Sequence, residues 1–94
     1  MRKSLVAGNW KLNGTRENVR ELAAAVREGA TQGADVAVCP TFVHLSDVAA
    51  VLEGGLVALG AQDCAVREQG AFTGEVAAEM LAEYGCRYAI VGHS

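Results

Sequence analysis

Residues 35–40 read Asp-Val-Ala-Val-Cys-Pro, in which an unbroken apolar run is closed by a proline. A strand with one face in water alternates apolar and polar residues, whereas a strand of a parallel sheet covered by helices is apolar throughout. On either side of this segment, similar runs occupy residues 4–8, 56–61 and 87–91. We therefore expect buried, parallel strands in all of these segments.

The segments between these runs carry helical patterns. After Thr15, a suitable N-cap residue, apolar side chains such as Val19 and Leu22 recur at helical spacings, with charged residues between them. Two further helices are expected over residues 45–52 and 75–84, the last of them ended by a glycine. Strand and helix thus alternate, which predicts an α/β fold. Right-handed crossovers would bring the carboxyl ends of the strands to one edge of the sheet.

The composition is that of one small globular domain. The chain has 94 residues, of which 51% are hydrophobic, and it contains one proline. The net charge of −3 leaves no broad basic field, so neither nucleic acid nor an anionic membrane is an expected partner. The apolar run near the N-terminus stops at Gly8, which makes it too short for an export signal or a membrane span.

The cysteines Cys39, Cys64 and Cys86 are odd in number and widely spaced. They form no Cys-x-x-Cys pair and have no histidine cluster nearby, so the sequence favours neither a disulfide framework nor a metal site. We expect reduced, mostly buried thiols in a cytoplasmic protein, and no cofactor.

Polar residues follow the strand runs at the edge where the carboxyl ends should meet. Asn9 and Lys11 follow the first run, Gln62 the third and His93 the fourth. Parallel α/β proteins place their active sites at this edge, so these residues form a candidate site. Gln62 is more readily explained as structural, with a supporting role near Lys11 as the alternative. His44 has no motif around it and is expected at the surface or as a helix cap.

Three motifs resemble those of the triosephosphate isomerase family in order and spacing. After the first, third and fourth strands, they are Gly8-Asn9-Trp10-Lys11, Gly70-Ala71-Phe72-Thr73-Gly74-Glu75 and Val91-Gly92-His93-Ser94. The resemblance implies that residues 1–94 are the N-terminal part of a single TIM-barrel domain. They would supply three parallel (βα) units and a fourth strand, an incomplete barrel, since a whole one needs about 250 residues.

The resemblance also implies an isomerase of glycolysis and gluconeogenesis that interconverts dihydroxyacetone phosphate and glyceraldehyde 3-phosphate through an enediolate. Lys11 matches the family's active-site lysine, Asn9 its substrate-contacting asparagine and His93 its catalytic electrophile. Lys11 would be both catalytic and substrate-binding, because an ammonium neutralises a phosphate and the charge that develops on the enediolate oxygen.

By the same resemblance, Thr73, Gly74 and Glu75 match a loop that inserts into a neighbouring subunit, which implies a homo-oligomer, a dimer in the family. The family's glutamate base follows a sixth strand, and its phosphate-binding loops follow the seventh and eighth. Those segments lie beyond the part of the family matched here. A polypeptide of these 94 residues alone is therefore expected to be nearly inactive.

Two other interpretations remain open. A non-catalytic half-barrel module would self-associate through its open sheet edges and the loop at residues 70–75, and it would ignore phosphate ligands. A flavodoxin-like nucleotide binder is less consistent with the sequence, because no glycine-rich phosphate loop follows the first strand.

Overall fold

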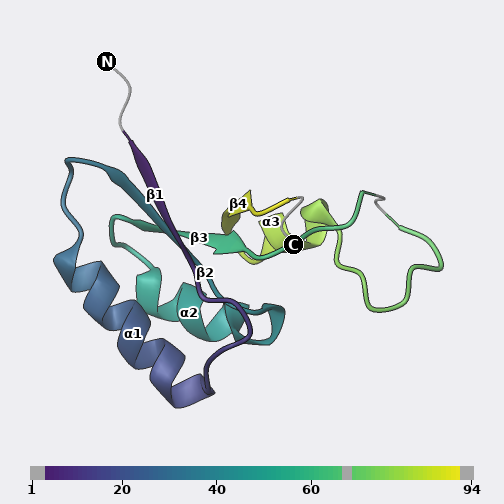
Figure 1. Ribbon diagram of the computed structural model, residues 1–94, viewed down its shortest axis with the longest axis horizontal. Helices are drawn as coiled ribbons and strands as arrows, with labels where there is room; N and C mark the ends of the chain where they lie inside the picture. The colour runs from purple at the N-terminus through teal and green to yellow at the C-terminus, as the bar shows by residue number, and fades with distance from the viewer. Residues whose placement is uncertain (1–3, 67–68, 92–94) are drawn as a thin grey trace.

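The computed structural model describes residues 4–66 and 69–91. These residues form one parallel four-stranded sheet in the order β1-β2-β3-β4, with helices in the connections (Figure 1). The elements in chain order are β1 (Leu5–Asn9), α1 (Arg16–Gly29), β2 (Asp35–Cys39), the 3₁₀ helix η1 (Phe42–His44), α2 (Leu45–Leu52), β3 (Val57–Ala61), α3 (Ala78–Glu83) and β4 (Cys86–Ala89). The predicted parallel α/β alternation is confirmed. No helix in the described part of the chain is long and apolar enough to cross a membrane.

Helix α1 begins where the sequence predicts. The Thr15 hydroxyl accepts a hydrogen bond from the Asn18 backbone N–H at 3.2 Å, and the Asn18 side-chain oxygen accepts one from the Thr15 N–H at 2.7 Å. This reciprocal pair satisfies two backbone donors that have no partner inside the helix. The helix then buries Val19 and Ala23.

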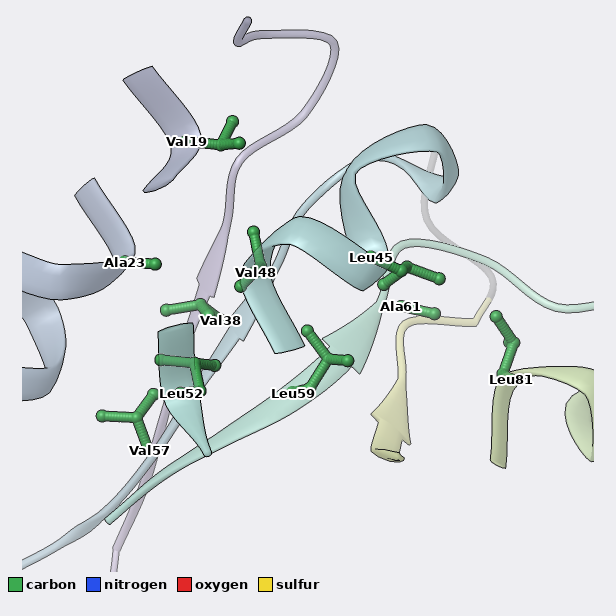
Figure 2. Packing of buried hydrophobic residues seen from close by; sticks show 10 residues of the cluster. All are labelled: Val19, Ala23, Val38, Leu45, Val48, Leu52, Val57, Leu59, Ala61 and Leu81. Carbon is green, nitrogen blue, oxygen red and sulfur yellow. The ribbon is translucent and has the colours of Figure 1, made fainter. Parts of the chain in front are cut away.

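The hydrophobic core lies between the helices and one face of the sheet. Val38 of β2 and Leu59 of β3 pack there with Val48 and Leu52 of α2, and Val19 of α1 belongs to the same cluster (Figure 2). Burying a side chain of this size contributes roughly 1.5–3 kcal/mol. The core therefore fixes α1 and α2 against the central strands, whose ends carry the candidate site.

The outer strands are less buried than their apolar composition predicts. β1 and β4 each have one neighbouring strand, because they form the two edges of the sheet. Leu5 and Val6 of β1 remain 50% and 56% exposed. The expectation of burial is thus wrong for β1 and β4, whereas the open sheet edges expected of an incomplete barrel are confirmed.

Helix α3 is shorter than the helix predicted over residues 75–84. The Ala65 N–H donates to the Val76 carbonyl at 2.8 Å, and Ala65 and Ala77 form an isolated parallel bridge. These contacts hold the backbone extended up to Ala77, so the helix starts at Ala78. At its other end Gly85 has a φ of 88°, as predicted for a glycine that ends a helix.

An ion-pair cluster joins α1 to α2. The carboxylate of Asp47, which is nearly buried in α2, accepts hydrogen bonds from Arg16 Nε and Nη2, both at 3.1 Å, and from Arg20 Nη2 at 2.6 Å. The hydrogen bonds from Arg16 and then Arg20 hold the pKa of Asp47 below its ordinary value. A carboxyl with a lowered pKa stabilises the fold above its unfolded pKa, and that stabilisation disappears as the pH falls through the folded pKa.

We therefore expect Asp47→Asn to lower the thermal midpoint at pH 7 and to have progressively less effect as the pH falls below about 4. Thermal unfolding at a series of pH values measures the gap between variant and wild type. Asp35→Asn, which changes an exposed carboxyl at the start of β2, is the matched control. A gap for Asp47→Asn that stays constant from pH 7 to pH 3 would contradict this account.

Candidate active site

The carboxyl ends of β1, β2 and β3 meet at one edge of the sheet, as predicted. The register pairs Asn9 with Cys39, the last residues of β1 and β2. Just beyond this pair, the Trp10 N–H donates to the Cys39 carbonyl at 3.1 Å. The same carbonyl accepts a second hydrogen bond, at 2.9 Å, from the side chain of Gln62, which follows β3. The three strand ends are thus tied together directly above the core.

The turn at Lys11 has an unusual backbone conformation. Its φ is +54°, and Lys11 is the one non-glycine residue with a positive φ in the described part of the chain. A residue held in this region costs about 1–3 kcal/mol, and such strain clusters at functional sites. The Lys11 N–H donates to Asn9 Oδ1 at 2.9 Å, and Asn13 Nδ2 donates to the Trp10 carbonyl at 2.9 Å. Side chains of the loop itself therefore support the turn.

Asn9 and Lys11 consequently present complementary groups at this edge. The side-chain oxygen of Asn9 accepts a hydrogen bond from the Lys11 N–H, so the amide nitrogen of Asn9 is the group left to bind a ligand. Within the described residues that nitrogen makes no hydrogen bond to protein, and the Lys11 side chain is exposed. An amide donor and an ammonium carried by one loop are groups suited to bind a phosphate or a developing oxyanion.

Gln62 occupies the supporting position that the sequence offered as the less favoured alternative. Its Nε2 donates to the Lys11 carbonyl at 2.7 Å and to the Cys39 carbonyl at 2.9 Å. It is half-buried and follows Ala61, which is fully buried. The position of Gln62 directly after a strand was visible in the sequence. Its two hydrogen-bond partners could not be read from the sequence.

His93, together with Gly92 and Ser94, lies outside the described residues, so its position beside Lys11 stays a prediction. The chain that leads to it is described. The Ile90 N–H, just after β4, donates to the Ala61 carbonyl at 2.9 Å. The backbone therefore leaves β4 at the same edge of the sheet that carries Lys11.

The loop containing Thr73, Gly74 and Glu75 is exposed and extends away from the sheet (Figure 1). Within the described residues no hydrogen bond joins it to Asn9 or Lys11. It is organised locally, because the Glu75 N–H donates to the Phe72 carbonyl at 3.0 Å and Gly74 has a φ of 86°. In this chain the structure therefore separates the predicted interface residues from the predicted site.

His44 is buried rather than at the surface; it occupies the N-cap position of α2, the other place predicted for it, but its side chain makes no capping hydrogen bond. It is 8% exposed, its side chain caps no helix, and its Nδ1 lies 3.0 Å from the Thr41 hydroxyl. His44 also lines a groove of about 510 Å³ at the carboxyl ends of β1 and β2, the edge that carries the candidate site. The groove is lined by Leu12, Asn13, Gly14, Thr41, Phe42, Val43 and His44.

The cysteines have the character predicted for structural thiols. None forms a disulfide; Cys39 is buried, and Cys64 and Cys86 are partly buried. Burial raises the pKa of the Cys39 thiol, and burial followed by the nearby Cys39 raises that of Cys86. Raised pKa values disfavour the thiolate that nucleophilic chemistry needs.

Comparison with known proteins points to one family. The family model described as Triosephosphate isomerase matches residues 4–94. The triosephosphate isomerase of Magnetococcus marinus is 55% identical over 97 residues, which cover 100% of this chain and 38% of that protein. The enzyme of Nitrosococcus oceani is 50% identical, again over 100% of this chain and 38% of its own length.

A crystal structure of triosephosphate isomerase from Bartonella henselae superposes with a TM-score of 0.90 at 36% sequence identity. The match covers 99% of this chain and 39% of that one. The chain therefore spans about two fifths of the length of the proteins it matches.

Proposed function

Because the chain belongs to the triosephosphate isomerase family, whose model matches residues 4–94, we propose that its strand-end site serves the interconversion of dihydroxyacetone phosphate and glyceraldehyde 3-phosphate. The observation that carries the proposal is the strained Lys11 turn, fixed by the Asn9 side chain at the carboxyl edge of a parallel sheet. This edge is where such folds bind their substrates.

The reaction moves a proton between adjacent carbons through an enediolate. A base takes the proton from one carbon, negative charge develops on the neighbouring oxygen, and the proton returns to the other carbon. The Lys11 ammonium attracts the substrate phosphate and stabilises that charge, and Asn9 Nδ2 donates to the same oxygen. His93 acts as the second electrophile. The base and the remaining phosphate contacts come from the segments that the family carries beyond the matched two fifths.

The test is an assay of the full natural protein that contains residues 1–94, with glyceraldehyde 3-phosphate as substrate and detection of dihydroxyacetone phosphate. We expect turnover, and we expect binding of 2-phosphoglycolate, a phosphate compound whose carboxylate resembles the enediolate. Folded protein that neither turns over the substrate nor binds this compound would reject the proposal. It would favour the non-catalytic half-barrel module instead, whose open sheet edges the structure contains.

We also propose that the protein works as a homodimer in the cytoplasm, with its thiols reduced. The support is a pair of exposed apolar features on one chain. Phe72, next to Thr73 on the projecting loop, is 49% exposed, and the groove beside His44 carries Leu12 and Val43 at 93% and 79% exposure. In a two-fold dimer the loop of each chain would enter the groove of the other chain. Both loops and both grooves would then be covered.

Thr73→Asp should then raise the dimer dissociation constant at least about tenfold, since it places a charge in an apolar groove. Light scattering over a range of protein concentrations measures this shift. Thr31→Asp, at an exposed turn before β2, adds the same charge away from the loop and should leave the mass unchanged. An unaltered dimer in the Thr73 variant would remove the loop from the interface.

A further inference from the structure

We propose that Gln62 is a positioning residue of this site: its side-chain amide holds the backbone of Lys11, and thereby aims the ammonium. The inference rests on the proposed function, and it assigns a role to a residue that does not itself touch the substrate. Three observations support it, namely the pairing of the amide, the strain at Lys11 and the part of the fold to which Gln62 ties the loop.

The amide nitrogen of Gln62 uses both of its hydrogens to bind backbone carbonyls. An amide NH₂ has two hydrogens, and here one points to the Lys11 carbonyl at 2.7 Å and the other to the Cys39 carbonyl at 2.9 Å. Both partners are acceptors only, so the nitrogen, and not the oxygen, must face them. A glutamine supplies both donors from one atom without adding charge.

The strain at Lys11 gives this bond its importance. With a φ of +54°, the residue is held in a conformation that a free lysine would leave. Its N–H is bound by Asn9, which is only two residues away and moves with the loop. Its carbonyl is bound by Gln62, which is 51 residues away. Gln62 therefore supplies the long-range restraint on the Lys11 backbone, through the carbonyl, whereas the restraint on the N–H is local.

The anchor point of Gln62 is rigid. It follows Ala61, the fully buried last residue of the central strand β3, whose carbonyl is also bound by Ile90 N–H at 2.9 Å. The second bond of Gln62, to Cys39, fixes it to β2. Gln62 thus connects the loop that carries Lys11 to the interior strands of the sheet, although that loop follows β1, an exposed edge strand. Side chains aimed from such supported positions keep the geometry that catalysis requires.

The experiment is a double-mutant cycle in the full natural protein that contains residues 1–94. Gln62→Met keeps the length of the side chain and removes both donors. We expect it to raise the dissociation constant for 2-phosphoglycolate about tenfold, equivalent to about 1.4 kcal/mol. In a Lys11→Met background, the same change should alter the constant less than about twofold, because the group it positions is gone. Chemical-shift titration reaches the millimolar range that the double variant requires.

Gln32→Met is the matched control, since it makes the same change at an exposed turn at the opposite edge of the sheet. It should leave the dissociation constant unaltered in both backgrounds. Gln62→Asn is the milder second variant, because it keeps the amide and shortens the side chain by one methylene. It too should raise the dissociation constant in the wild-type background and leave it almost unchanged in the Lys11→Met background.

The outcomes separate the possible failures. A purely structural Gln62 would lower the thermal midpoint and weaken binding equally in both backgrounds, which would overturn the inference. Wild-type protein that does not bind 2-phosphoglycolate would instead reject the proposed function. In that case the backbone φ of residue 11, measured by NMR, still decides: a left-handed φ retained in Gln62→Met would overturn the positioning role.

Discussion

Replacing Lys11 with methionine in the full natural protein should lower kcat/KM for glyceraldehyde 3-phosphate about 1000-fold. Removing a single preorganised donor to a developing oxyanion already costs about 100- to 1000-fold in rate. In the proposed function Lys11 also supplies the positive charge that attracts the phosphate, so the loss should lie at the upper end of that range. Methionine retains the length and the apolar stem of the side chain, which limits the change to the charged group.

Two comparisons make this prediction specific. Lys11→Arg keeps the charge but replaces a compact ammonium with a planar guanidinium, so it should restore little of the activity. Arg87→Met removes an exposed cation from β4 and should leave kcat/KM within about twofold of wild type. The rates come from a coupled assay over a range of substrate concentrations. A Lys11→Met protein with near-normal turnover would remove Lys11 from the site.

A polypeptide of residues 1–94 alone should isomerise glyceraldehyde 3-phosphate at least about 10⁴-fold more slowly than a complete family member. A positioned general base contributes about 10²- to 10⁴-fold, and the family's base lies outside the matched segment. The missing phosphate contacts increase the loss further. In addition, β1 and β4 leave both sheet edges open, so the polypeptide should self-associate, and its mass in solution should exceed that of one chain.

Restoring the rest of a barrel provides the matched test. Residues 1–94 match the N-terminal 38% of the Magnetococcus marinus enzyme, so they can be fused to the part of that protein that follows. The chimera should recover turnover, and its Lys11→Met version should not. Turnover that copurifies with the 94-residue polypeptide, and that Lys11→Met abolishes, would refute the requirement for the missing segments.

The sheet was predictable from sequence because its signal is local and repeated. Each strand lies in a short apolar run, polar residues follow the first, third and fourth runs, and the Thr15 cap lies three residues from its partner Asn18. The start of α3 was not predictable in the same way. It depends on a bridge between Ala65 and Ala77, which replaces the first turn of a helix that the periodicity favours.

The finer geometry of the site escaped prediction for a related reason. The positive φ of Lys11 has no signature in the residue itself, since lysine avoids this conformation. The bonds made by Gln62 depend on the direction of one side chain across a gap of 51 residues. His44 is buried because η1 turns it inward, although its neighbours in sequence form no motif.

The contact between Gln62 and Lys11 also imposes an order on events during synthesis. The cap of α1 joins residues three positions apart, so it needs no distant part of the chain. The Lys11 turn cannot bind Gln62 until 51 further residues have been translated and β3 has docked. The first helix is thus capped by its own neighbours, whereas the turn that holds Lys11 depends on a strand that is made much later.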